Sequence, residues 1–300
     1  MEKFESMNLN DLLHKQGIDP SQVIVMRHRP TERKLRKVLP WLVHEKPDVF
    51  NAYQQKHSGK QEAALEKLLG KGWIASFIGM KLGQAVFAGL YKIAGARPVT
   101  YEEYWSMPVN LALKSLGMAD WDTADRLKQR LWFDLVLQPV YAEWVGKLVI
   151  SWPPPELSWW RYAGRNEMMV LSISEESRFS ERMPDWRNLV LSWAELQSIP
   201  TSWQTTLKHW RGIYFIHDAS DGKGYVGSAY GTDNIMGRWL NYAANGHGGN
   251  KHLLKRAPEN FHFSILQIVA HDLSSDDIVS IESAWKDRLH TRGPFGLNEN

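Results

Sequence analysis

The chain has 300 residues, with 15 Trp, 36 Lys and Arg, 33 Asp and Glu, a net charge of +3 and no Cys. Its length is sufficient for two globular domains, and the lack of Cys excludes a disulfide-stapled scaffold, a thiolate metal site and a Cys nucleophile. No apolar run approaches the roughly 18 residues that cross a bilayer, and the N-terminus has no charged segment followed by an apolar one. We therefore expect a cytoplasmic protein without a membrane partner.

The first 199 residues predict one α+β domain. An apolar run at 23–26 precedes two expected helices, at 31–46, interrupted by Pro40, and at 61–70. Strand-like runs lie at 73–78, 85–93, 132–137, 148–152, 168–173 and 189–193, with a mixed connector at 100–125 that is helical around 111–116. Gly residues within and beside runs such as 83–95 indicate strongly bent strands. We expect a bent sheet or small barrel rather than a parallel α/β core.

The densest positive charge of the chain lies between residues 27 and 37. Within this segment Arg33, Lys34, Arg36 and Lys37 are candidates for binding phosphate groups of a polyanion. A basic cluster is more often only the solvated face of a helix, so both interpretations stay open. Eleven of the 15 Trp also lie before residue 200, where one or two exposed rings could stack on a base.

Residues 200–300 predict a second, compact domain. A short helix at 203–210 leads into a hairpin of two strands, at 211–218 and 224–229, joined by a turn at 219–223. Helices are expected at 235–244, ending at Gly246, and at 251–256, followed by a strand at 261–269 and a helix at 274–290 that begins at Ser274. This order gives a three-stranded sheet flanked by helices. The whole chain is expected to be an α+β protein with domains 1–199 and 200–300.

The predicted hairpin carries two short motifs, Gly212-Ile213-Tyr214 and Tyr225-Val226-Gly227, whose tyrosines are eleven residues apart. Arg238 follows in the next helix, Glu282 lies in the last helix, and Asn298 lies close to the end of the sequence. This ordered set resembles the GIY-YIG nuclease superfamily, and each of the five positions falls where a functional residue of the family would fall. The resemblance covers about the last 90 residues and says nothing direct about the first 200.

Elementary geometry brings several of these residues together. If the hairpin turns near Ala219-Ser220, Tyr214 and Tyr225 become cross-strand neighbours. Glu282 falls at the edge of the apolar stripe of the last helix, where a carboxylate needs a cation, a metal ion or hydrogen-bond donors. Arg238 lies one helical turn from Tyr242 on the apolar side of its helix. The alternative is that Arg238 and Glu282 form an ion pair with a purely structural role.

The resemblance implies hydrolysis of a DNA phosphodiester with one Mg²⁺ or Mn²⁺ per active site. Glu282 would be the only protein ligand of the metal, and Arg238 would stabilise charge on the phosphate. Tyr214, with Tyr225 sharing the site, would orient or deprotonate the attacking water. Because a phenol has a pKa of about 10, nearby positive charge would have to lower it.

Many relatives have a Lys directly after the second motif, and Ser228 stands there in this chain. Lys223, on the same strand face as Tyr225, is the expected substitute. Tyr242 either contacts the phosphate or only packs. In the Gly-rich segment 245–251, His247 and Lys251 are candidates for binding DNA phosphate at the start of the next helix, with a flexible loop as the alternative.

We expect a metal-dependent DNA endonuclease whose N-terminal domain selects a sequence or a modified base, as in restriction or defence against foreign DNA. The alternatives are a nuclease that repairs or processes branched DNA, and a catalytically silent DNA-binding protein. A site with one metal ion cuts one strand at a time, so double-strand cleavage needs a homodimer or two encounters. Residues 201–300 contain ten basic and ten acidic residues, so the grip on DNA should come mainly from the first 200.

Overall fold

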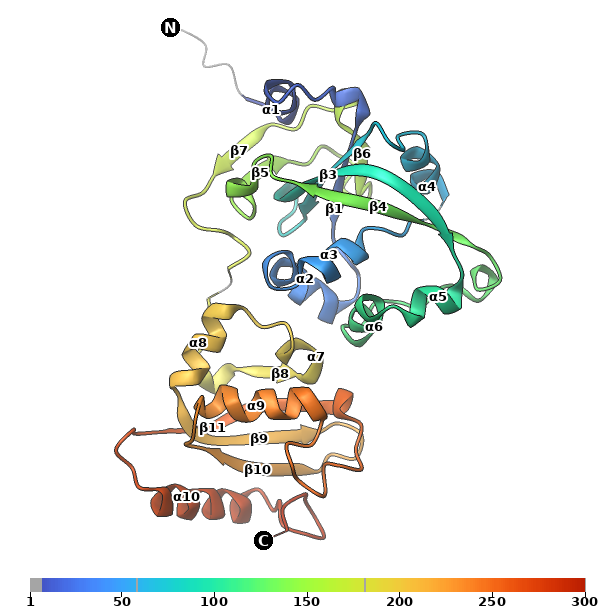
Figure 1. The fold of residues 1–300 in the computed structure, drawn as a ribbon. Helices are drawn as coiled ribbons and strands as arrows, with labels where there is room; N and C mark the ends of the chain where they lie inside the picture. The colour runs from blue at the N-terminus through green and yellow to red at the C-terminus, as the bar shows by residue number, and fades with distance from the viewer. Residues whose placement is uncertain (1–6, 58, 181, 300) are drawn as a thin grey trace, which may run out of the picture. The chain divides into compact units, whose positions relative to one another are not determined.

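The computed structural model describes residues 7–57, 59–180 and 182–299 (Figure 1). Two compact units, 1–181 and 182–300, make up the chain, and each has a sheet of its own. None of the helices within the described residues is both long and apolar enough to span a bilayer.

The boundary between the units lies before the expected one at 198–201. Strand β8 (Val190–Ser192) pairs antiparallel with β11 (Phe261–Val269), which brings residues 190–192 into the second unit. Helix α7 (Trp193–Leu196) follows at once, and its N-cap Ser192 and Glu195 form a reciprocal capping box. The sequence prediction was wrong here because β8 is short and its partner lies far along the chain, so local patterning did not assign it to the second sheet.

The first unit is built on a seven-stranded sheet in the order β6-β1-β2-β3-β5-β7, with β4 paired to β3. Strands β1 and β2 are parallel, and the other pairs are antiparallel. The sheet curls into a half-barrel, which confirms the predicted bent sheet (Figure 1). Its strands are β1 (Val23–His28), β2 (Trp73–Ile78), β3 (Gln84–Val99), β4 (Arg130–Gln138), β5 (Leu148–Ser151), β6 (Trp160–Tyr162) and β7 (Val170–Ile173).

Glycines in β3 allow this curvature. Gly89 has a φ of +144° and pairs with Ser76 where the register between β2 and β3 shifts. A Cβ at this position would lie 3.0 Å from Leu137 Cδ1 of β4, so the neighbouring strand approaches the bare backbone closely. A second register shift, between Ile93 and Gly95, bends β3 against β4. Irregularities of this kind increase the twist of a strand and turn a flat sheet into a curved one.

Helices cover this sheet and connect its strands. They are α1 (Leu9–Lys15), α2 (Arg33–Glu45), α3 (Pro47–Tyr53), α4 (Gly59–Glu66), α5 (Tyr101–Ser106) and α6 (Pro108–Ser115). The prediction that Pro40 interrupts this helix is wrong. Helix α2 continues through Pro40, with Leu39, Trp41 and Leu42 buried. Packing of this face offsets the hydrogen bond that the proline cannot donate.

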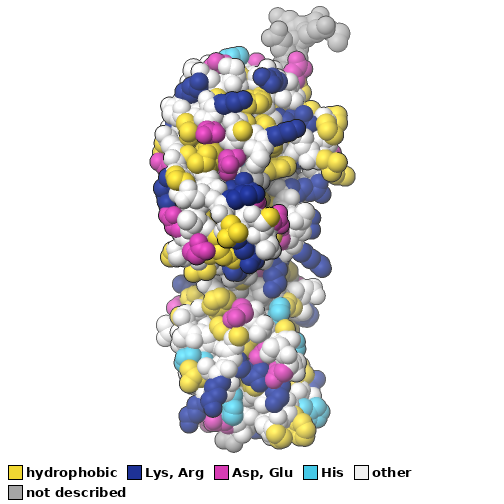
Figure 2. Space-filling view, turned by 90° about the vertical axis from the view of Figure 1, so that its right-hand side faces the viewer, with side chains coloured by type: hydrophobic (Ala, Val, Ile, Leu, Met, Phe, Trp, Pro, Cys, Tyr) yellow, Lys and Arg dark blue, Asp and Glu magenta, His cyan; other side chains and the backbone are white. Residues whose placement is uncertain are grey.

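The outer face of α2 is basic. Arg33, Lys34, Arg36 and Lys37 are exposed, whereas Leu35 between them and Val38 after them are buried. On the face of the N-terminal unit drawn in Figure 2, Lys and Arg side chains lie among acidic and apolar ones rather than in one continuous patch. On this face, positive charge is therefore interspersed with acidic and apolar side chains.

The second unit is a four-stranded antiparallel sheet in the order β10-β9-β11-β8, with β9 (Arg211–Asp218) and β10 (Gly224–Ala229) forming the hairpin. Its other helices are α8 (Thr201–His209), α9 (Asn234–Asn245) and α10 (Ser275–Arg288). The hairpin strands and β11 have the predicted bounds, and β8, which was predicted at 189–193 but assigned to the first domain, adds a fourth strand. Trp239 of α9 packs near Phe263 of β11, while Ile278 of α10 packs with Ile213 and Val226. Because Ile213 and Phe263 point to opposite faces, the two helices cover opposite faces of the sheet.

The helix predicted at 251–256 does not form, and turns occupy this segment. The side chain of Asn250 accepts hydrogen bonds from the backbone N–H groups of His252, at 2.8 Å, and Leu253, at 3.2 Å. Gly248 and Gly249, directly before it, have left-handed φ angles of +53° and +87°. Local bonds from an Asn side chain compete with helical hydrogen bonding and here replace it.

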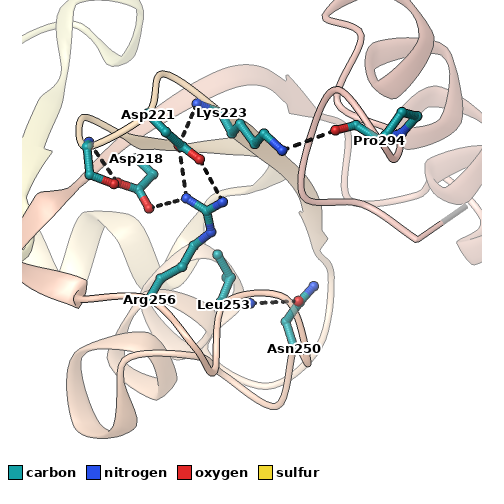
Figure 3. Close-up of polar contacts among 8 residues, drawn as sticks. Asp218, Asp221, Lys223, Asn250, Leu253, Arg256 and Pro294 are labelled. Carbon is teal, nitrogen blue, oxygen red and sulfur yellow. Dashed lines mark hydrogen bonds and ion pairs between the residues drawn. The ribbon is translucent and has the colours of Figure 1, made fainter.

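An ion-pair cluster fixes this turn segment to the hairpin (Figure 3). Arg256 lies 2.5 Å from the carboxylate of Asp218, which is 1% exposed, and 2.8 Å from that of Asp221. Its hydrogen bond to Asp221 lowers the pKa of that carboxyl to about 2. Burial would raise the pKa of Asp218, but the hydrogen bonds from Ser220 and Arg256 outweigh burial and lower it. The cluster therefore contributes stability that is present above the ordinary carboxyl pKa and is lost as the pH falls.

We expect Arg256→Leu to lower the free energy of unfolding at neutral pH by about 2 kcal/mol, because Asp218 stays buried without its cation. The difference from wild type should shrink between about pH 4 and pH 2, where the carboxyls of the folded wild type take up protons. Urea unfolding across this pH range measures the difference in free energy of unfolding. The control is Lys255→Leu, at an exposed neighbour. A difference that stays constant with pH would contradict the conclusion that the ion pairs of Arg256 with Asp218 and Asp221 stabilise the fold.

Candidate active site

The two motif tyrosines share a face of the hairpin but are not directly opposite each other. In the observed register Tyr214 pairs with Gly227 and Tyr225 pairs with Ile216, so the prediction of cross-strand neighbours is wrong by two residues. The tyrosines are diagonal, with ring centroids 6.4 Å apart. A side chain at Gly227 would overlap the hydroxyl of Tyr214, so this glycine leaves room for the ring between the strands.

Tyr242 of α9 completes a cluster of three tyrosines. Its hydroxyl lies 3.0 Å from that of Tyr214, and both side chains are buried, at 3% and 1% exposed. Burial raises the pKa of Tyr214 and of Tyr242 far above the ordinary phenol value. Both phenols are therefore neutral at physiological pH and are poor proton acceptors. Tyr225 is only partly buried, and it lines a cavity together with Tyr242, whereas Tyr214 does not.

This cavity has a volume of about 380 Å³ and collects residues from widely separated segments. Tyr225 comes from β10, Arg238 and Tyr242 from α9, Lys286 from α10, and Asn298 and Glu299 from the end of the described chain. The Gly-rich loop from Gly248 to Lys251 forms the remaining side. Of the predicted phosphate-binding residues in this loop, Lys251 lines the cavity, whereas His247 accepts a hydrogen bond from the backbone N–H of Gly249 through Nδ1 at 3.0 Å.

Ser228 of β10 links the two helices that flank the edge strand. Its carbonyl accepts a hydrogen bond from Arg238 Nε at 3.4 Å, and its hydroxyl donates one to Glu282 Oε2. The other carboxylate oxygen of Glu282 lies 2.7 Å from Lys286 Nζ, one turn along α10, and both side chains are largely buried. The site is thus a short polar chain around the edge of β10, with one guanidinium, one carboxylate and one ammonium.

Two predicted site residues have other roles in the structure. The side chain of Asn298 accepts from Val226 N at 2.9 Å and donates to Val226 O at 2.8 Å, so it pairs with the backbone of β10 as an added strand would. Asn298 thus holds the end of the described chain against β10 and also lines the cavity. Lys223 donates to the carbonyl of Pro294 at 3.1 Å and is not among the residues that line the cavity, so it does not replace the missing lysine (Figure 3).

Lys286 is the site residue that the sequence analysis did not find. It lines the cavity with Tyr225 and Arg238, and its ammonium neutralises Glu282. The spacing of Glu282 and Lys286, four residues apart on a helix, could have indicated the pair, because such residues face the same side. The missing information was the position of α10 beside β10, which only the tertiary structure supplies.

Glu282 is the residue of this site that could hold a metal ion. Among the described residues there is no group of three or more His, Cys, Asp or Glu side chains that could bind one. A single carboxylate beside a polar cavity suits a hard cation that keeps most of its water, such as Mg²⁺. The carboxylate is 16% exposed, and its two oxygens contact the hydroxyl of Ser228 and the ammonium of Lys286, so a metal ion would have to displace one of these partners.

No protein-family model, curated protein or solved structure matches this chain.

The contact between Gly248 and Tyr242 offers a test of how tightly the loop closes on the tyrosine cluster. Gly248 has a φ of +53°, and a Cβ there would lie 2.6 Å from the ring of Tyr242, whereas Gly249, at +87°, has open space around it. We expect Gly249→Ala to cost about 1 kcal/mol from backbone strain alone, and Gly248→Ala about 2–3 kcal/mol because it also overlaps the ring. Chemical denaturation of both variants measures this. Equal costs would show that the loop does not rest on Tyr242.

Proposed function

We propose that the second unit is a phosphodiester hydrolase and that the protein is a metal-dependent DNA endonuclease. The observation that carries the proposal is that Arg238, Lys286 and Tyr225 line one cavity at the edge of β10, with Glu282 paired to Lys286 next to it. Positive groups for a phosphate, a carboxylate for a hard cation and a phenol beside them form a set suited to phosphoryl chemistry. Together with the resemblance of the five ordered residues to the GIY-YIG superfamily, this set favours hydrolysis of DNA over a silent binding module.

Glu282 would hold one Mg²⁺ or Mn²⁺, which when bound supplies a Lewis acid for the phosphate and its leaving oxygen. Arg238 would bind a non-bridging phosphate oxygen and stabilise the charge that grows there. Lys286, which pairs with this carboxylate, would add positive charge to the phosphate site.

Tyr225 is the better candidate for contacting the attacking water, although the sequence analysis favoured Tyr214. Tyr225 lines the cavity, whereas Tyr214 is 1% exposed and its hydroxyl is hydrogen-bonded to that of Tyr242. Tyr225 would orient or deprotonate the attacking water, with the cations of Lys286 and Arg238 lining the same cavity. Tyr214 and Tyr242 would keep the Tyr225 ring in place, since the ring centroids of both lie 6.4 Å from it.

The first unit would select the target, by sequence or by modified base, as in cytoplasmic restriction or defence. Its exposed basic face on α2 supports a role in gripping the DNA backbone. A homodimer would allow cleavage of both strands by single-metal sites. Repair of damaged or branched DNA is the second candidate, and cleavage substrates separate the two.

We expect wild-type protein to cut plasmid or genomic DNA in the presence of Mg²⁺ or Mn²⁺, and Glu282→Ala to lose at least 10²–10³-fold in rate. Tyr225→Phe should lose about as much, whereas Tyr214→Phe should lose less than about tenfold because its phenol does not face the cavity. Glu259→Gln, at an exposed residue of the same unit, is the control.

Substrates should include unmodified, base-modified and branched DNA, each with a panel of divalent metals. Discrete fragments favour sequence selection, and cleavage restricted to modified DNA favours selection of a modified base. The proposal is wrong if the wild type cuts none of these substrates. Equal losses in Tyr214→Phe and Tyr225→Phe would contradict the assignment of roles to the two tyrosines.

A second test concerns the basic face of α2. Replacing Arg33, Lys34, Arg36 and Lys37 together by Gln should weaken DNA binding and reduce the slope of log affinity against log salt by about 0.9 for each phosphate contact that is lost. Salt titrations of binding in the absence of divalent metal measure the slope, with Lys60→Gln, at an exposed lysine of α4, as the control. An unchanged slope would show that this face is only solvated surface.

A further inference from the structure

A cavity of about 440 Å³ in the first unit is not used by the chemistry above. It lies where β1 and β2 end beside α2, and the segment at 178–179 closes it. Its floor is apolar and includes Trp41, Ile78 and Phe179, each less than 5% exposed. Its volume falls within the range of about 300–1,000 Å³ that is usual for small-molecule sites.

Among the described residues that line this cavity, the charged side chains are basic. Arg29, Arg36, Lys37 and Arg178 line it and are exposed, and none of the described residues around the cavity is acidic. His28 also borders it, but burial lowers the pKa of its imidazole to about 3, so it is neutral and accepts or donates a hydrogen bond with Ser76. Four cations around an apolar floor suit a ligand with an anionic part and a flat apolar part.

The tight turn between β2 and β3 borders the cavity through Met80. On this turn Met80 is 47% exposed and Leu82 is 72% exposed, with the exposed Lys81 between them. The turn is held firmly, because Gly83 N donates to Glu156 at 2.6 Å and Gly83 O accepts from Trp152 N at 2.8 Å. Exposed apolar side chains on a rigid turn are the kind that proteins insert between stacked base pairs.

We propose that this cavity binds one nucleotide turned out of the DNA duplex, with the base on the apolar floor, its phosphates on the four cations, and Leu82 in the gap left in the stack. Enzymes that inspect a base take it out of the helix and read it in a pocket that excludes the wrong shape. The proposal rests on the proposed function, since it takes DNA as the substrate, and it identifies the element that selects the target.

The first test uses mononucleotides and the full chain in EDTA. Saturation-transfer NMR with dAMP, dCMP, dGMP, dTMP and 5-methyl-dCMP should give signals on base protons for at least one of them. Arg178→Gln should weaken that binding at least fivefold, whereas Lys60→Gln should leave it unchanged. Binding of none of these nucleotides, or equally tight binding of inorganic phosphate alone, would overturn the proposal.

The second test separates the turn from the cavity. Leu82→Asn should weaken binding of duplex DNA at least fivefold and leave mononucleotide binding unchanged, because Leu82 acts only on the stacked duplex. Leu127→Asn is the matched control, since Leu127 is 97% exposed elsewhere on the same unit. Equal effects of the two substitutions on duplex binding would overturn the role of the turn.

The two proposals fail in different ways. A wild-type protein that cuts DNA but binds no mononucleotide contradicts the nucleotide cavity and leaves the nuclease proposal standing. A protein that binds mononucleotides through Arg178 but cuts no DNA with any metal supports the cavity and contradicts the nuclease proposal.

Discussion

The edge strand β10 is the constraint on which the second unit depends. With the sheet order β10-β9-β11-β8, one side of β10 has no strand partner, and an open edge invites pairing with other chains. Asn298 covers it with two hydrogen bonds to Val226, and Leu297 N donates to Gly224 O at 2.9 Å. The same covering brings the end of the chain to the rim of the cavity. The contacts of Asn298 with β10 thus both cover the sheet edge and form part of the wall of the cavity.

Burial divides three similar phenols into two classes. Tyr214 and Tyr242 hold each other by their hydroxyls in an environment that strongly favours the neutral form, while Tyr225 remains at the cavity. The charged groups follow the same logic. Glu282 is stable beside β10 because Lys286 and Ser228 satisfy both carboxylate oxygens. Together these contacts bring one carboxylate, two cations and one accessible phenol to a single edge, in a unit that has almost no net charge of its own.

Local sequence patterns predicted much of this unit correctly. Strands β9, β10 and β11 have the expected bounds, Gly246 ends α9 in a left-handed conformation, and Ser274 caps α10. The failures have several causes. Strand β8 depends on a partner distant in sequence, and the turns at 251–256 depend on side-chain bonds that compete with a helix. The offset of Tyr214 from Tyr225 comes from the hairpin register, which centres the turn between Ser220 and Asp221. The predicted position of Lys223 also depended on a residue distant in sequence, because its ammonium donates a hydrogen bond to the carbonyl of Pro294.

By itself the sequence determined the α+β class, the bent first sheet, the hairpin and the identity of Tyr225, Arg238 and Glu282 as candidates, because periodicity and short motifs are local properties. The tertiary structure decided that Tyr225 and Tyr242 line the cavity and Tyr214 does not, that Lys286 and not Lys223 joins them, and that Asn298 pairs with the backbone of β10. It also revealed the basic-rimmed cavity between β1, β2 and α2. These features arise where distant segments pack together, and their energies depend on burial and partners that no single segment of the sequence contains.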